Sequence, residues 1–265
     1  MTSCAQAQPA ADSTAQWRTS VVLPGEALQI ATDALQNVYL LRPNYDLEMY
    51  DSKGNLLYVY SNSRFGVPTH IDASDPFNIL LYYADYRQLQ VLDRTLNEIR
   101  AFNLIDLDYG NATAVGLSPD GALWLYDELQ FRMLKIAADG RVLIESENLQ
   151  LRFDQSLSPL AIFTRQNYLY VLDEALGLLA FDQFGQYLRT YDVSGAKEVS
   201  VLQRRIFYHI IGRKLYVIDL ETLATYDLLL PSTEAPILQV SVQRKIVAVR
   251  YANQVTVLQL PNRKN

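Results

Sequence analysis

The chain has 265 residues, of which 49% are hydrophobic and 20% charged, and 29 acidic against 23 basic residues give a net charge of −6. The apolar content excludes a wholly disordered chain, and the acidic balance argues against non-specific nucleic-acid binding, so we expect no nucleic-acid partner. One Cys and two His exclude a disulfide framework and any Cys-rich or His-rich metal centre. No apolar run approaches the roughly 18 residues of a membrane span.

The N-terminal 16 residues are mostly small and polar, which predicts a flexible tether over 1–16. Within it, Cys4 follows small residues and precedes a polar stretch. This arrangement resembles the start of a mature bacterial lipoprotein, and the resemblance implies a lipid on Cys4 as the chain's only membrane attachment. The alternative is a disordered cytoplasmic tail in which Cys4 is incidental.

Six strand-like runs end in the same way, with an apolar residue that is usually followed by Asp. The six marks are Tyr50-Asp51, Leu92-Asp93, Ile136-Ala137, Phe181-Asp182, Ile218-Asp219 and Leu258-Gln259. Consecutive marks lie 37 to 45 residues apart. A repeat of this length is typical of a propeller blade with four strands.

The third repeat displays the parts of one blade most clearly. Four runs rich in Val, Leu, Ile, Tyr and Phe are predicted as strands at 113–117, 122–126, 131–136 and 142–145. The first connection is Ser118-Pro119-Asp120-Gly121, with Pro and Gly at positions that suit a tight turn. Each repeat is therefore expected to form four antiparallel strands.

The last repeat is one strand short. Residues 237–242, 245–249 and 254–258 supply three strands, and the unused strand-like segment at 17–23 can supply the fourth. A blade assembled from both ends of the chain closes the ring and leaves no open edge between its first and last blades. We predict an all-β, six-bladed β-propeller in one domain over 17–265.

The repeats resemble six-bladed propellers of the NHL-repeat kind. The resemblance rests on the hairpin from Asp127 to Ile136, which is followed by Asp139-Gly140, with partial matches at 85–88 and 50–54. Together with Cys4, the chain is similar to propeller lipoproteins of Bacteroidetes-type cell envelopes. This resemblance implies binding of proteins, peptides, glycans or nucleic acids, since only a minority of such propellers are enzymes.

Charged residues recur near the ends of the predicted inner strands, which line the central channel. They are Asp33, Asp72, Asp120, Arg165 and Arg204, and His70 lies within the inner strand of the second blade. Blade geometry predicts that these six side chains gather at one channel mouth as a binding site. The alternative is that the Asp residues simply bond to nearby turn amides. We interpret His209 as structural, and Asp85, Asp127 and Asp173 as turn residues.

No P-loop, dinucleotide-binding Gly motif, His-Glu-x-x-His motif or nucleophile elbow is present, so no catalytic residue, metal site or cofactor is predicted. The leading hypothesis is a non-enzymatic scaffold in the cell envelope (periplasm or outer membrane), bound to protein partners such as an outer-membrane or secretion complex. Its charge is uneven, −11 over 1–194 and +5 over 195–265. The alternatives are a small-molecule-binding or metal-dependent, lactonase-like enzyme at the channel mouth, and a cytoplasmic scaffold.

Overall fold

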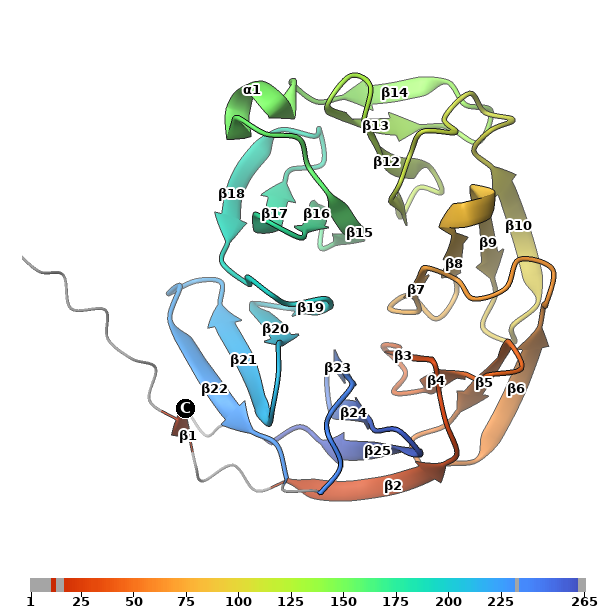
Figure 1. Ribbon diagram of the computed structural model, residues 1–265, viewed down its shortest axis with the longest axis vertical. Helices are drawn as coiled ribbons and strands as arrows, with labels where there is room; N and C mark the ends of the chain where they lie inside the picture. The colour runs from red at the N-terminus through yellow and green to blue at the C-terminus, as the bar shows by residue number, and fades with distance from the viewer. Residues whose placement is uncertain (1–10, 13–16, 232–233, 262–265) are drawn as a thin grey trace, which may run out of the picture.

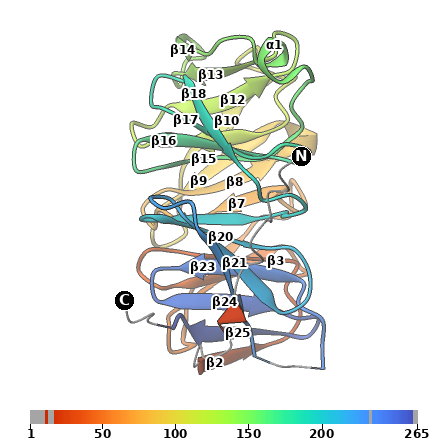
Figure 2. The same ribbon diagram turned by 90° about the vertical axis from the view of Figure 1, so that its left-hand side faces the viewer.

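The computed structural model describes residues 11–12, 17–231 and 234–261. Its strands form six sheets arranged as blades around a central channel (Figure 1). The prediction of an all-β, six-bladed propeller with four antiparallel strands in each blade is confirmed. Seen edge-on, the blades stack into a disc (Figure 2).

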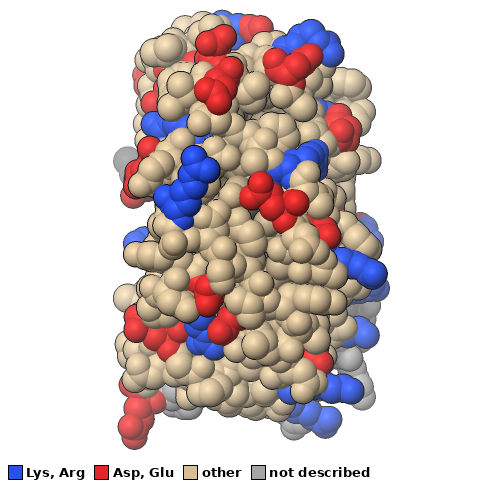
Figure 3. Space-filling model, turned by 90° about the vertical axis from the view of Figure 1, so that its right-hand side faces the viewer, with Lys and Arg blue, Asp and Glu red and all other residues tan. Residues whose placement is uncertain are grey.

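In blades 1 to 5 the strands run in chain order from the channel to the rim. Blade 1 comprises β3 (Gln29–Thr32), β4 (Val38–Leu41), β5 (Asp46–Tyr50) and β6 (Leu56–Ser61). Blade 2 comprises β7 (His70–Asp72), β8 (Ile79–Tyr83), β9 (Gln88–Leu92) and β10 (Glu98–Asn103). Blade 3 comprises β11 (Val115–Leu117), β12 (Leu123–Asp127), β13 (Arg132–Ile136) and β14 (Val142–Glu145). The outer strands β6 and β10 lie on the side of the disc that Figure 3 faces.

The remaining blades repeat this order, except that the outer strand of the last one comes from the other end of the chain. Blade 4 comprises β15 (Pro159–Arg165), β16 (Tyr168–Asp173), β17 (Gly177–Phe181) and β18 (Tyr187–Tyr191). Blade 5 comprises β19 (Val199–Leu202), β20 (Arg205–His209), β21 (Lys214–Asp219) and β22 (Thr225–Leu229). Blade 6 comprises β23 (Gln239–Gln243), β24 (Ile246–Arg250), β25 (Gln254–Gln259) and β2 (Arg18–Pro24).

Both ends of the chain contribute to ring closure, as predicted. Strand β2 pairs antiparallel with β25, with Arg18 opposite Gln259 and Pro24 opposite Gln254. The structure also shows pairing inside the segment predicted to be a flexible tether. There β1 (Ala11–Asp12) runs parallel to β22 and becomes a fifth strand of blade 5. The rest of that segment, including Cys4, lies outside the described residues.

The repeated Asp residues mark the turn between the third and fourth strands of a blade. The Oδ1 atoms of Asp51, Asp93 and Asp182 each accept backbone N–H groups from residues two and four positions further on, at 2.8 to 3.0 Å. Asp127 and Asp173 end the second strands of their blades, and each accepts backbone N–H groups from residues two and three positions further on, which confirms their predicted role as turn residues. The sequence repeat is therefore a repeat of side-chain-closed turns.

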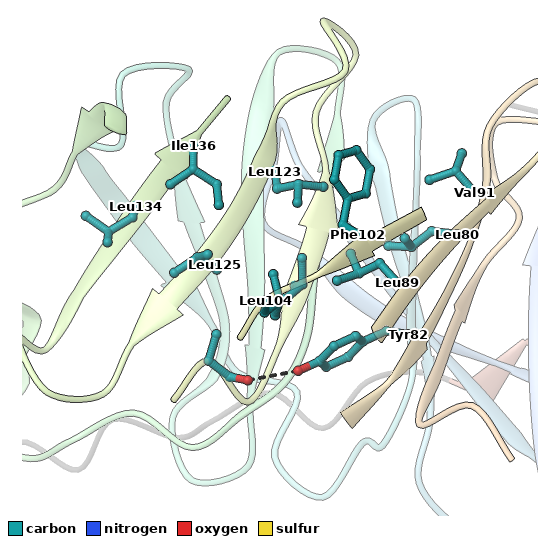
Figure 4. Packing of buried hydrophobic residues seen from close by; sticks show 12 residues of the cluster. Leu80, Tyr82, Leu89, Val91, Phe102, Leu104, Leu123, Leu125, Leu134 and Ile136 are labelled. Atoms are coloured by element: carbon teal, nitrogen blue, oxygen red, sulfur yellow. Dashed lines mark hydrogen bonds between the residues drawn. The ribbon is translucent and has the colours of Figure 1, made fainter. Parts of the chain in front are cut away.

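The hydrophobic core lies between neighbouring blades. Six clusters of buried side chains occupy the six blade interfaces, because each sheet presents one apolar face to each neighbour. Between blades 2 and 3, Leu80 and Leu89 pack against Leu123 and Leu125 (Figure 4). In the same interface the Tyr82 hydroxyl donates a hydrogen bond to the Ala112 carbonyl at 2.8 Å.

Helix is nearly absent from the described chain. A single α-helical turn, α1 (Leu149–Phe153), precedes blade 4, and a 3-10 turn at Ala84–Tyr86 contains Asp85. Within the described residues, no helix has the length and apolar character needed to cross a membrane.

Candidate functional site

The central channel contains a cavity of about 770 Å³. Side chains from β3, β7, β15, β19 and β23 line it, whereas no residue of blade 3 does. Blade 3 is excluded because β11 packs directly against β15. A Cβ atom on Gly116 of β11 would lie only 2.3 Å from the carbonyl oxygen of Ile162. The cavity is thus bounded by blades 1, 2, 4, 5 and 6.

An ion pair connects blades 2 and 4 across this cavity. Arg165, the last residue of β15, donates from Nη2 to Asp72 Oδ1 at 2.9 Å and from Nη1 to Asp72 Oδ2 at 3.3 Å. Its guanidinium also lies 5.0 Å from the centre of the Phe163 ring. Burial by itself would raise the pKa of Asp72, but the positive charge of Arg165 and the hydrogen bonds outweigh it and lower that pKa well below its usual range.

His70 lies two residues before Asp72 on the same short strand and also lines the cavity. Burial lowers the pKa of its imidazole, and the charge of Arg165 lowers it further while Asp72 opposes the shift. The net shift favours the neutral form of the ring. Its Nε2 atom is buried and has no hydrogen-bond partner, which is uncommon for a polar atom in this position.

A second polar group converges from blades 1, 5 and 6, with the Gln239 side chain at its centre. Gln239 Oε1 accepts from the Ile30 backbone N–H at 2.9 Å and from Arg250 Nε at 3.1 Å. Gln239 Nε2 donates to the Ile30 carbonyl at 2.9 Å and to Glu198 Oε1. Arg250 Nη1 donates to the Ala27 carbonyl at 3.0 Å. One amide therefore joins a carboxyl, a guanidinium and a neighbouring strand.

Glu198 is the unusual member of this group. Its side chain is exposed to the open cavity, and partial desolvation by the surrounding blades raises the pKa of its carboxyl to about 7. The hydrogen bond from Gln239 and the charge of Arg250 oppose the shift without cancelling it. Burial likewise lowers the pKa of Arg250, against the opposing charge of Glu198. Near neutral pH the cavity thus holds a carboxyl that is close to half ionised.

The structure brings three of the six predicted site residues, His70, Asp72 and Arg165, to this cavity. Asp33 does not line it. The Asp33 carboxylate closes its own β3–β4 turn, where it accepts from the backbone N–H groups of Leu35 and Asn37 and from the Tyr39 hydroxyl, each at 2.8 Å. The expectation of one shared mouth is therefore wrong for Asp33, because nearby turn amides engage its oxygens.

Asp120 and Arg204 also lie away from the cavity. Asp120 binds Lys135 Nζ at 2.7 Å on an exposed hairpin, beside a smaller hollow of about 210 Å³. Arg204, in the turn after β19, forms an exposed ion pair with Glu221. Each of the two residues pairs with a charged side chain of its own blade, so the prediction that they gather at the channel mouth is wrong. A ligand-binding role for any of the six residues stays a prediction.

Sequence reasoning missed Glu198, Gln239 and Arg250. Glu198 directly precedes the inner strand β19 and Gln239 begins the inner strand β23, whereas the predicted site relies on charged residues near the ends of inner strands. Arg250 ends β24 and reaches the cavity from a second strand. His209, interpreted as structural, lies 2.9 Å from the Gly212 carbonyl through Nε2 and also lines the cavity. In the described part of the chain, no three His, Cys, Asp or Glu side chains are grouped to hold a metal ion.

No known protein-family model matches the chain, and no curated protein matches its sequence. Solved structures match in fold. A chain of the mitotic checkpoint complex is 7% identical with a TM-score of 0.62, covering 98% of this chain and 97% of that chain. Virginiamycin B lyase from Staphylococcus aureus, in selenomethionine form, is 11% identical with a TM-score of 0.58, covering 92% and 100%. BBS1N in complex with ARL6DN is 9% identical with a TM-score of 0.58, covering 94% and 98%. At these identities the likeness supports the β-propeller fold alone.

Proposed function

We propose that this protein is a non-enzymatic protein-interaction module that binds an extended strand of a partner along the outer edge of blade 1. The observation that carries the proposal is the surface of β6. Leu56, Leu57, Tyr58 and Val59 follow one another in this strand, and their exposed fractions are 51%, 42%, 42% and 46%. Figure 3 shows broad uncharged areas on this side of the disc, between scattered charged side chains. Contiguous exposed apolar surface of this kind is typical of a binding site.

The other outer strands carry the charges that discourage strand addition. Each of β2, β10, β14 and β18 contains at least one Asp, Glu, Lys or Arg, whereas β6 (Leu56–Ser61) contains none. The acidic residue of β22, Asp227, is buried and does not protect that edge, which is covered by β1. Edge charges are a common protection against unwanted pairing. An outer strand without them is therefore suited to pair with another chain.

Blade 5 shows that an outer strand of this propeller accepts an added strand. There β1 extends the sheet in parallel, with Ala11 opposite Asp227 and Asp12 opposite Leu228. Main-chain hydrogen bonds along such an edge supply affinity, and side chains at alternate positions supply specificity. The partner segment proposed for β6 is accordingly extended, uncharged and apolar on the face that meets Leu57 and Val59.

The proposed location is the cell envelope, with the propeller held by a lipid on Cys4 as part of an outer-membrane or secretion assembly. The support is the sequence alone, namely Cys4 in its small and polar surroundings and the NHL-like hairpins. Metabolic labelling with an alkyne fatty acid in the native host should label the protein, and Cys4→Ser should abolish the label. An unlabelled protein in the cytosolic fraction would instead identify a cytoplasmic scaffold.

The docking proposal is tested by placing a photoreactive amino acid at position 58 and irradiating cells of the native host. We expect one discrete crosslinked species, whose partner is identified by mass spectrometry and then purified. Val59→Lys should weaken binding of that partner at least tenfold, about 1.4 kcal/mol. Ile99→Lys on β10 is the matched control, because Ile99 is 47% exposed and Val59 46%. Crosslinking to a second copy of the chain, or equal loss in both variants, would refute the proposal.

A further inference from the structure

The cavity has the dimensions and lining of a small-molecule site, and it is separate from the docking surface proposed on β6. Its volume of about 770 Å³ lies within the range of about 300 to 1,000 Å³ that is usual for pockets of small ligands. Much of the wall is apolar and comes from blades 2, 4, 5 and 6, including Ile71, Leu160, Phe163, Val201 and Val240. A few polar side chains interrupt the apolar lining. Their hydrogen-bond and ion-pair partners within the protein indicate what kind of ligand would be complementary.

The two guanidinium groups in the cavity are already engaged. Arg165 is bidentate to Asp72, and Arg250 donates to Gln239 and to the Ala27 carbonyl. Glu198 differs, because its only hydrogen-bond partner in the described part of the chain is the neutral amide of Gln239, and no ion pair reaches it there. The other titratable groups that line the cavity are Glu174, Lys197 and His209. Glu198 is therefore a carboxyl that faces the cavity without an ion-pair partner among the described residues.

A second unpaired group lies across the channel. His70 Nε2 is buried without a partner on β7 of blade 2, and Glu198 precedes β19 of blade 5. Blades 2 and 5 are opposite one another in the ring of six, and β7 and β19 face each other across the centre of Figure 1. Both groups line the same cavity, so a ligand long enough to cross it would meet both.

We propose that the cavity binds a small organic amine, with its ammonium on Glu198, its apolar body against the cavity wall and a hydroxyl or amide group on His70. An ammonium supplies the opposite charge that Glu198 lacks, and a hydrogen-bonding group satisfies the His70 imidazole. An anion is disfavoured, since it would approach Glu198 and Asp72 while both guanidiniums are occupied, and Lys197 is the lining cation that it would have to reach instead.

The charge requirement is tested with three matched probes, tyramine (cation), tyrosol (neutral) and 3-(4-hydroxyphenyl)propanoate (anion). Calorimetric titration at pH 8, where Glu198 is mainly ionised, should show tyramine binding at least tenfold more tightly than tyrosol, with the anion weakest. Glu198→Gln should weaken tyramine at least tenfold. The matched control is Glu221→Gln, which removes an exposed carboxylate outside the cavity and should change nothing. No saturable tyramine binding, equal affinity for the three probes, or tighter binding of the anion would overturn the proposal.

A proton-release measurement separates a role in binding from a merely structural one. Because a bound ammonium favours the ionised carboxyl, tyramine binding at pH 7 should release up to about half a proton, seen as a buffer-dependent binding enthalpy. Glu198→Gln should abolish the release, and His70→Phe should weaken tyramine but not 2-phenylethylamine, which lacks the hydroxyl. Unchanged proton release in Glu198→Gln contradicts the assignment. Val59→Lys should leave tyramine binding intact, so the amine site and the docking surface on β6 can be refuted independently.

Discussion

Two carboxyl groups share one cavity and have pKa values shifted in opposite directions. Asp72 receives a bidentate guanidinium, and its pKa falls well below the usual range. Glu198 receives a neutral amide, and its pKa rises to about 7. Burial opposes ionisation at both sites, so the difference comes from what compensates the charge. Desolvation by the blades therefore does not by itself determine whether a carboxyl in this channel is ionised.

The position of Gln239 explains why the second site lacks an ion pair. Its carbonyl oxygen accepts a hydrogen bond from Arg250 Nε, and its amide nitrogen donates one to Glu198. The Gln239 amide therefore lies between the two charged groups. The same side chain also satisfies both backbone groups of Ile30 in blade 1. The link between blades 6 and 1 thus leaves Glu198 without a bound cation.

The largest change in the free energy of unfolding is expected when Asp72 loses its ion-pair partner and so resembles Glu198. Arg165→Met leaves the Asp72 carboxylate without its cation and should lower the free energy of unfolding by about 3 kcal/mol at pH 7. Urea unfolding measures the loss. The double variant Asp72→Leu with Arg165→Met should recover most of it, since no enclosed charge then remains. A loss below about 1 kcal/mol would mean that channel water already solvates the pair.

The next largest change in stability is expected on removing the Gln239 amide, which lies between Glu198 and Arg250. Gln239→Leu leaves the Ile30 N–H and C=O without their side-chain partners, and we expect a loss of about 2 kcal/mol in the free energy of unfolding. Gln243→Leu is the matched control, because this buried Gln of the same strand accepts one hydrogen bond, from its neighbour Arg244. Equal losses in the two variants would contradict the bridging role of Gln239.

A smaller, pH-dependent effect is expected at Glu198. Its folded-state pKa is raised above the unfolded value of 4.5, so its contribution to stability is fully present below about pH 4.5 and is lost as the pH rises through about 7. Glu198→Gln should therefore gain about 1 kcal/mol relative to the wild type between pH 5 and pH 8, after allowance for screening by cavity water. Asp72 behaves in the opposite way, because its stabilisation is present above pH 3.8 and is lost as the pH falls. Urea unfolding at several pH values distinguishes the two slopes, and a pH-independent difference between wild type and Glu198→Gln would be inconsistent with a raised pKa.

The smallest change in the free energy of unfolding is expected at Asp120, which is exposed, pairs with Lys135 and lies outside the channel where the sequence places it. Asp120→Asn should change the free energy of unfolding by less than about 0.5 kcal/mol, because solvent screens this pair. Affinity for tyramine should be unchanged. A loss comparable to that of Arg165→Met would show that the exposure of the Asp120 carboxylate does not weaken its ion pair relative to that of Asp72.

The architecture was predictable because its determinants are local and repeated. Asp51, Asp93 and Asp182 each close a turn with amides no more than four residues away, so the blade period is visible along the chain. The closing strand was also predictable, since 17–23 was the one strand-like segment left over when the last repeat lacked a fourth strand. The same local chemistry misled the site prediction, because Asp33 near a strand end closes a turn in the way that the repeated Asp residues do.

The sequence by itself determined the six blades, their four strands and the closure of the ring, because alternation, turn residues and period are properties of neighbouring residues. Only the tertiary structure decided the cavity and its charges. Arg165 meets Asp72 across 93 positions, and Gln239 meets Ile30 across 209. It also decided that Glu198 lacks a cation, since Arg250 is directed to Gln239 and Ala27 by the packing of blades 6 and 1. Such pairings depend on how the blades pack around the channel, and no local pattern in the chain encodes them.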